Sequence, residues 1–424
     1  CGSRHGPTTV FPKREKRCWE PEMKSRKYLQ MALLNFTVLG IWGVLLRYLQ
    51  THALHGLNYQ FLLHGHSHFA FAGWMFLSLA VLMADCLGAG AGDSRFRGIF
   101  KLVQVCSLGM LVTFTLQGYQ AVPILFSTLF VLITYWFSFL VLRNPAFKAR
   151  LNLPARNLIG AALIFLCLSS LGPFALGPLM VKGLKDSPLY QNSIYFYLHF
   201  QMNGWMVLGA LGLFASRYLE RFSTDRQDLF WLRAFIWSSV PLYFIFTLWS
   251  GPDWLRTTLA ATGAGLHLLA WIRICAACKR KVPELPVLVR AALAAITLKS
   301  VLQLLICLPP LGDWVFVNRN LIIGYIHLIT LGSVSPLILD QFRIRGFLPA
   351  GKAGTVLNTL YLAGTGLYLG LLFIQPLLGR LGIRISHFHT CLLLISVLLV
   401  LLGLSYYALS SRRARKAPGP SAVR

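Results

Sequence analysis

The chain has 424 residues, of which 56% are hydrophobic and only 12% are charged. A soluble protein of this length would carry roughly twice that charged fraction, so the composition argues against a soluble fold. Lysine and arginine outnumber aspartate and glutamate by 40 to 13, but they lie in short loops between apolar segments and form no basic domain. This distribution is typical of a membrane protein with many spans, and no nucleic acid is expected as a partner.

Twelve segments are apolar and long enough to cross a bilayer, which takes about 20 residues. In chain order they cover 29–49, 61–83, 99–117, 121–141, 158–180, 193–215, 229–249, 258–277, 287–308, 319–339, 357–378 and 387–409. We therefore predict an all-α, polytopic membrane protein in contact with membrane lipid. It has a basic tail over 1–28, a twelve-helix membrane domain over 29–409 and a second basic tail over 410–424.

Lysine and arginine also predict the orientation of the chain. Both tails are basic, and so are the loops that follow the even-numbered segments. Basic loops remain on the cytoplasmic side, so we expect both termini to be cytoplasmic and the even-numbered helices to run from outside to inside. The expected location is a bacterial inner (plasma) membrane.

Eight histidines lie within the predicted segments, all on even-numbered helices and all in the half expected to face outward. They are His64, His66, His68, His199, His267, His327, His387 and His389. Histidine is costly in hydrocarbon, so several of them at one membrane depth indicate a shared ligand. Haem iron, copper and zinc are the ligands that bind neutral imidazole.

Helical geometry separates neighbouring histidines, because successive residues turn by about 100° around the helix axis. We expect His64 and His68 on one face of their helix and His66 on the nearly opposite face. His387 and His389 diverge in the same way, by about 200°. One metal cannot easily use both members of such a pair, whereas two cofactors on opposite sides of a helix can.

Lys299 lies near the centre of the ninth predicted helix, where an unpaired ammonium is expensive. It can pair with a carboxylate or a haem propionate, line a proton path, or be uncharged. Acidic residues are nearly absent from the spans, with Asp85 and Asp340 at helix ends. Since a proton pump needs buried carboxylates along its path, strong proton pumping is not expected.

Twelve helices, cytoplasmic termini and histidines on the second and sixth helices resemble the haem-copper oxidase catalytic subunit superfamily. The run Ser386–His389 is similar to the His-x-His pair of that superfamily. The resemblance implies a haem-copper-oxidase-like bundle in which His387 binds a high-spin haem and His389 binds a low-spin haem. That family carries its pair on the tenth helix, whereas here it opens the twelfth.

The same resemblance assigns roles to the earlier histidines. His64 or His68 would complete the low-spin haem site, and His199 would match the copper or non-haem metal ligand of the sixth helix. The seventh helix has no His-His pair, so a three-histidine copper site is not evident.

A second resemblance is to NnrS-type proteins, which are twelve-helix haem- and copper-containing membrane proteins linked to nitric oxide tolerance. It rests on His64-Gly-His66 and on the stretch 325–332. It adds His327 as a candidate haem ligand and His66 as a candidate metal ligand.

Together these features predict a membrane oxidoreductase with one or two haems and optional copper, acting on O2 or NO or transferring electrons. Its expected partners are a small gas ligand and an electron-donor cytochrome or quinol. Three alternatives stay open. One is an NnrS-like haem protein for nitric oxide sensing or tolerance without turnover, and the second is a divalent-metal transporter. The third is a scaffold whose histidines are only interfacial or packing residues, a reading that is strongest for His267.

Overall fold

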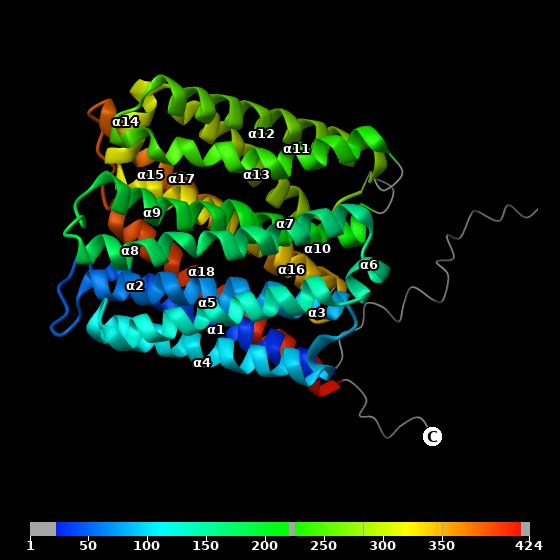
Figure 1. Cartoon of the computed structure of the whole chain (residues 1–424). Helices are drawn as coiled ribbons and strands as arrows, with labels where there is room; N and C mark the ends of the chain where they lie inside the picture. The colour runs from blue at the N-terminus through cyan, green and yellow to red at the C-terminus, as the bar shows by residue number, and fades with distance from the viewer. Residues whose placement is uncertain (1–22, 220–224, 283, 350, 417–424) are drawn as a thin grey trace, which may run out of the picture.

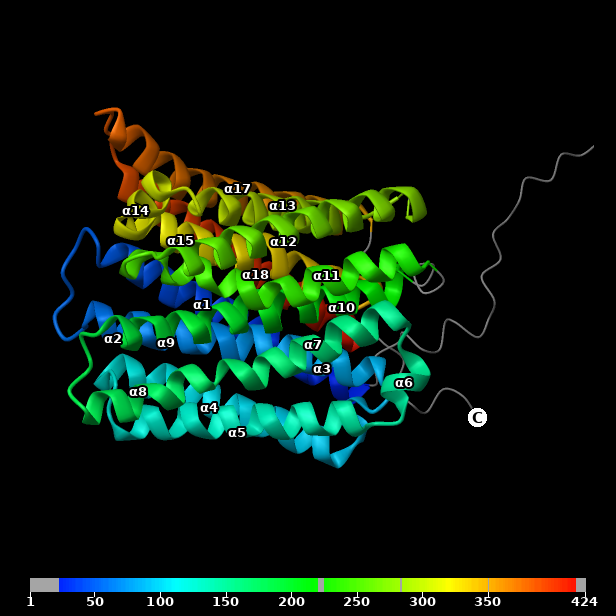
Figure 2. The same cartoon turned by 45° about the horizontal axis from the view of Figure 1, so that its top comes forward.

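The computed structural model describes residues 23–219, 225–282, 284–349 and 351–416. Over these residues the chain is a bundle of helices that run side by side, with no β-strand in the described part (Figures 1 and 2). Eleven helices within the described residues are long and apolar enough to cross a membrane. The prediction of an all-α, polytopic membrane protein is confirmed.

The elements follow one another with short connections. In the first half of the chain they are α1 (Met23–Tyr48), α2 (Tyr59–Phe69), η2 (Ala70–Phe76), α3 (Leu77–Cys86), η3 (Gly90–Gly92), α4 (Ser94–Gln117), α5 (Ala121–Arg143), α6 (Ala146–Arg150), α7 (Leu153–Ser169), α8 (Leu171–Val181), α9 (Pro188–His199), η4 (Phe200–Met206) and α10 (Val207–Tyr218). In the second half they are α11 (Arg226–Leu242), η6 (Tyr243–Ser250), α12 (Trp254–Lys281), α13 (Val287–Ile306), α14 (Pro309–Val317), α15 (Arg319–His327), η7 (Leu328–Val334), α16 (Ser335–Ile344), α17 (Lys352–Arg380) and α18 (Phe388–Lys416).

The predicted segment 193–215 is the one that falls outside the eleven apolar spans. It is continuously helical from Pro188 to Tyr218, through α9, η4 and α10. Its low hydropathy has a plain cause, because it carries buried polar residues such as His199, Gln201 and Asn203 in its middle. A helix enclosed by other helices can hold such residues, since its neighbours supply their hydrogen-bond partners.

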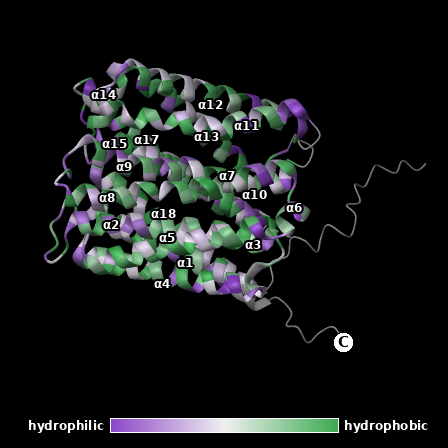
Figure 3. Ribbon diagram, viewed as in Figure 1, coloured by the Kyte–Doolittle hydropathy of each residue, from purple (hydrophilic) through white to green (hydrophobic). Residues whose placement is uncertain are grey.

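The bundle has two ends. The α1–α2 end carries the loops 49–58, 182–187, 251–253 and 381–387, and the terminal end carries α6 and the described start of α1. Hydrophilic residues gather toward both ends and hydrophobic ones along the middle, as Figure 3 shows. Residues 1–22 of the predicted N-terminal tail 1–28 lie outside the described part of the chain, and α1 already begins at Met23.

Three of the spans form the centre of the bundle. They are the helices that run through η2, η4 and η7, and α3, α10 and α16 contact one another. In the most apolar stretch of Tyr59–Cys86, 83% of residues are buried, against 28% in Phe388–Arg412. Peripheral helices instead present large apolar side chains outward, such as Val105 and Leu116 on α4 and Leu401 on α18. The surrounding helices therefore separate the central three from lipid.

Each central helix contains one π-helical stretch that begins one or two residues after a histidine. The three share the pattern His-x4-Gly, with the pairs His68/Gly73, His199/Gly204 and His327/Gly332. The histidines are 131 and 128 residues apart, so the pattern occurs three times at nearly equal spacing. π-Helical turns are rare and occur frequently at functional sites.

Side chains from neighbouring helices contact carbonyl groups of these π-helical stretches. Asn35 of α1 donates to the Gly73 carbonyl oxygen at 2.8 Å, and Tyr361 of α17 donates to the Leu331 carbonyl oxygen at 2.8 Å. In a membrane every buried backbone polar group needs such a partner inside the protein. The irregular stretches are thus held in place by polar contacts between helices.

Candidate functional site

The histidines of α2 lie on two faces of the helix, as their spacing predicts. His68 stacks on Phe114 of α4 with ring centroids 4.3 Å apart, and its Nε2 lies 3.1 Å from the Tyr119 hydroxyl. His64 contacts Tyr119 edge-on at 4.6 Å. His66 faces the opposite side, where its ring lies against Gly43 of α1.

His66 and His327 lie on two different central helices, α2 and α15, and we call them the ligand pair. Both rings border the same stretch of α1: the ring of His66 lies against Gly43, and the ring of His327 packs on Tyr368, which binds Arg47 one turn further along. Nδ1 of His327 lies 2.8 Å from the Ile323 carbonyl oxygen, so that nitrogen carries the proton and Nε2 keeps its lone pair. The buried Nδ1 of His66 has no hydrogen-bond partner among the described residues. Both rings thus have a nitrogen that the protein leaves available.

Arg47 of α1 is a buried cation beside the ligand pair, with 5% of its surface exposed. Its guanidinium donates to the Tyr368 hydroxyl at 2.5 and 3.1 Å, and the Tyr368 ring packs edge-on against His327 at 5.4 Å. Among the described residues, no carboxylate lies within ion-pair distance of Arg47. A buried guanidinium next to two imidazoles makes this region complementary to an anionic group.

His387 and His389 lie at the exposed start of α18, at the α1–α2 end. The expectation that His387 opens this helix is wrong by one residue, because α18 begins at Phe388 and His387 has a left-handed φ of 56° in the preceding turn. His389 Nδ1 lies 3.0 Å from Gln50 Oε1, and Gln50 in turn contacts Arg47. Within the described part of the chain, no ring contact or hydrogen bond joins either histidine to His64 or His68.

Lys299 is fully buried in the middle of α13, where it contacts a second group of buried polar side chains. We call this group the lysine cluster; its members are His199, Asn203, His267, Lys299, Gln303 and Tyr325. Lys299 Nζ donates to Asn203 Oδ1 at 2.8 Å and lies 3.4 Å from His267 Nε2. The sequence left the partner of Lys299 open, and the structure supplies an amide and an imidazole.

A chain of hydrogen bonds fixes the orientation of His199 and Asn203. His199 Nε2 donates to the Ser239 carbonyl oxygen at 2.8 Å, so Nδ1 is the acceptor nitrogen. Asn203 Nδ2 donates to that nitrogen at 3.3 Å, which turns Asn203 Oδ1 toward Lys299. Both nitrogens of His199 are therefore engaged by the protein.

The donor set around His199 does not fit copper or another divalent metal. No group of three or more His, Cys, Asp or Glu residues that could hold a metal ion occurs among the described residues. The nearest neighbours of the His199 ring are an amide and a backbone carbonyl, and a lysine lies beside His267. A cation next to the ligands disfavours a second cation between them.

A cavity of about 80 Å³ adjoins the lysine cluster on the side of the α1–α2 end. His199, Asn203 and Tyr325 line its base, and its walls are mostly apolar, with Phe246 and Ile322 among them. Nearly all of the atoms that border the cavity are apolar.

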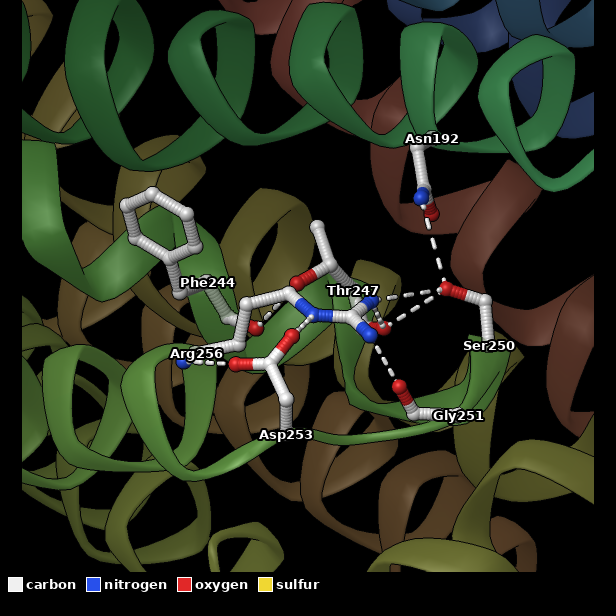
Figure 4. A network of polar contacts seen from close by, with 7 residues as sticks. All are labelled: Asn192, Phe244, Thr247, Ser250, Gly251, Asp253 and Arg256. Carbon is white, nitrogen blue, oxygen red and sulfur yellow. Dashed lines mark hydrogen bonds and ion pairs between the residues drawn. The ribbon is translucent and has the colours of Figure 1, made fainter.

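A polar network at the α1–α2 end holds α9 in position above this cavity. Asn192 of α9 donates to Ser250 Oγ at 3.4 Å, and Arg256 of α12 reaches the same hydroxyl oxygen at 3.4 Å (Figure 4). Arg256 also donates to the Gly251 carbonyl and forms an ion pair of 2.6 Å with Asp253. Hydrogen bonds from the backbone and side chain of Arg256 hold the pKa of Asp253 below its usual value.

Sequence reasoning missed Arg47 and Tyr368 because a single arginine near a helix end and a single tyrosine carry no motif. It also missed the repeated His-x4-Gly pattern, which was visible in the sequence and marks the three central helices. His327 shares the pattern with His68 and His199, whereas His387 and His389 do not have it.

The chain matches no protein-family model, and comparison with curated proteins gives no significant match.

Proposed function

We propose that this protein is a haem-binding membrane oxidoreductase that transfers electrons, with His66 and His327 as the two axial ligands of one haem. The observation that carries the proposal is the ligand pair itself. Two imidazoles from different central helices border the same stretch of α1, and each has a ring nitrogen without a hydrogen-bond partner among the described residues. Two neutral imidazoles are a common axial ligand set for haem iron.

The hydrogen bond of His327 supports this role. Axial histidines usually donate their second ring N–H to a carbonyl or carboxylate, which fixes the ring and raises the basicity of the ligating nitrogen. The Ile323 carbonyl oxygen, 2.8 Å from Nδ1, is such a partner.

Arg47 and Tyr368 supply the second part of the fit. Haem carries two propionate carboxylates, and a buried guanidinium with no carboxylate of its own is a suitable partner for one of them. Tyr368 both binds Arg47 and packs on His327, so it would couple the position of the cation to that of the axial ligand.

A haem held by two histidines supplies one-electron redox chemistry and leaves no coordination position open for a gas. Electron transfer is therefore favoured over reduction of O2 or NO, with a cytochrome or quinol as the electron donor. The proposal does not extend to copper at His199, because the nitrogens of that ring are engaged by Ser239 and Asn203. We further propose a bacterial inner membrane with both termini in the cytoplasm, since the loops at the terminal end are rich in lysine and arginine.

The test is a set of histidine variants purified with haem supplied during expression. His66→Ala and His327→Ala should each lose the low-spin signal in a reduced-minus-oxidised spectrum, whereas His68→Ala, on the same helix as His66, should keep it. The proposal fails if the low-spin bands survive in both ligand-pair variants, or if His68→Ala removes them.

A further inference from the structure

We propose that the cavity between α9, η6, α14 and α15 binds a small, neutral, apolar molecule of only a few heavy atoms, taken up from the membrane. The site is separate from the ligand pair and does not depend on a bound haem. Its basis is an almost wholly apolar lining, polar neighbours that the protein already engages, and a volume larger than that of an ordinary packing gap.

The lining is the first step. Aromatic and branched aliphatic side chains border the cavity, among them Tyr195, Phe246, Phe316, Ile322 and Tyr325. Phe246 contacts both neighbouring tyrosines, with its ring centroid 6.4 Å from that of Tyr195 and 6.2 Å from that of Tyr325. A lining of this kind attracts a guest by dispersion and by the exclusion of water, and an apolar molecule needs no hydrogen bond to bind there.

The second step concerns the few polar residues next to the cavity, whose polar groups are already used within the protein. His199 donates from Nε2 to the Ser239 carbonyl oxygen and accepts at Nδ1 from Asn203. The Tyr325 hydroxyl accepts from Gln303 Nε2 at 2.8 Å and donates to Asn203 Oδ1 at 3.3 Å. A buried water needs about two to four polar partners, so the cavity favours an apolar guest over water.

The volume of the cavity limits the size of the guest. It is about 80 Å³, whereas a single water needs only about 10–15 Å³. Protein interiors are close-packed and contain few voids larger than a water molecule, so a cavity of this size is more than a packing gap. An engineered apolar cavity of about 150 Å³ binds benzene or xenon. A cavity of roughly half that volume therefore suits a molecule of only a few heavy atoms.

The elements around the cavity also favour entry from the membrane. α14 has nine residues and is too short to cross a bilayer. Leu308, directly before it, and Val317, at its end, are 53% and 80% exposed, so this side presents apolar surface. η6 is a 3₁₀-helical stretch of eight residues, and such stretches have poorer hydrogen-bond geometry than α-helix. Short and irregular elements open at a lower cost than full spans.

The experiment is xenon binding to crystals of the full chain, located by anomalous scattering. We expect a xenon peak in the cavity, against Phe246. Val315→Phe places a ring in the cavity from α14 and should abolish that peak. Val317→Phe adds the same ring to the same helix, at an exposed position outside the lining, and should keep the peak. Xenon does not ligate iron, so the result is independent of the ligand pair.

Should Val315→Phe fail to fold, Ile322→Phe fills the same cavity from α15 and should also abolish the peak. The proposal is overturned if the wild-type chain shows no xenon in the cavity, or if the filling variant binds xenon there as the wild type does. A wild-type chain that binds xenon in the cavity but contains no haem would contradict the proposed function alone.

Discussion

The ligand pair lies on two of the central helices, and the lysine cluster joins two central helices to α12 and α13, but the two regions use histidine in opposite ways. At the ligand pair, each imidazole has a nitrogen without a hydrogen-bond partner among the described residues, and the Arg47 cation lies beside the pair. In the lysine cluster, His199 and His267 have both nitrogens engaged, and the cation occupies the centre. The partners of a histidine, more than its place in the repeat, decide what it can bind.

The largest expected effect comes from breaking the lysine cluster at its shared acceptor. Asn203→Leu leaves Lys299, Tyr325 and His199 without their common partner and should lower the free energy of unfolding by about 3 kcal/mol. Adding Lys299→Met removes the stranded charge and should restore much of that loss. Chemical denaturation of the single and double variants measures both, and equal stability of the two would contradict the central role of the ammonium.

A second variant changes the packing of α2 next to the ligand pair. A Cβ at Gly65 would lie 2.5 Å from Thr115 Oγ1 and 2.9 Å from the Leu111 carbonyl oxygen, so Gly65→Ala must push α2 away from α4. We expect a loss of about 1–3 kcal/mol in the free energy of unfolding and a disturbed haem spectrum, because His66 is the next residue. Gly98→Ala, whose Cβ would meet nothing within 4 Å, is the matched control. An unchanged spectrum in Gly65→Ala would mean that His66 does not bind the haem.

The third variant tests the cation beside the ligand pair. Arg47→Leu removes a buried positive charge that favours the reduced, less positive haem, so the midpoint potential should fall by roughly 60 mV, a tenfold change in the equilibrium. Arg47→Lys retains the positive charge, so its midpoint potential should stay close to that of the wild type. Redox titration gives the values, with Arg319→Leu as an exposed control at the same end. A potential that is insensitive to Arg47 would place the haem elsewhere.

The smallest effect concerns the polar network of Figure 4, which positions the helix of His199. The lowered pKa of Asp253 means that its carboxylate stabilises the folded chain above its usual pKa of 3.8, and that this contribution is lost as the pH falls below that value. Thermal unfolding at pH 7 and in mild acid should therefore show a slightly steeper acid loss for the wild type than for Asp253→Asn. Identical slopes would mean that this ion pair does not stabilise the chain.

The sequence was sufficient to predict the membrane-spanning helices and the two faces of α2 on which its histidines lie. Long apolar runs predict spans directly, and a turn of about 100° per residue separates His66 from His64 and His68. The pairing of His66 with His327 could not be predicted from the sequence, since it depends on how α2 and α15 are rotated in the bundle. The sequence also could not show that the run Ser386–His389 falls at an exposed helix start, and the role predicted for its two histidines stays a prediction.

The polar side chains of the sixth span show the other limit. Asn203 and Gln201 lower its hydropathy, although they are buried among other helices. Window averages treat such residues as a weaker membrane signal, whereas in the folded chain they mark the most enclosed part of the bundle.

The most direct test of the central claim is a count of haem in the purified wild-type protein. A pyridine haemochrome assay gives haem per chain, and a reduced-minus-oxidised spectrum with and without carbon monoxide gives its ligation. We predict one low-spin haem per chain whose reduced spectrum does not respond to carbon monoxide. No haem under conditions that load a control cytochrome, or a haem that binds carbon monoxide readily, would contradict the assignment of His66 and His327 as its two ligands.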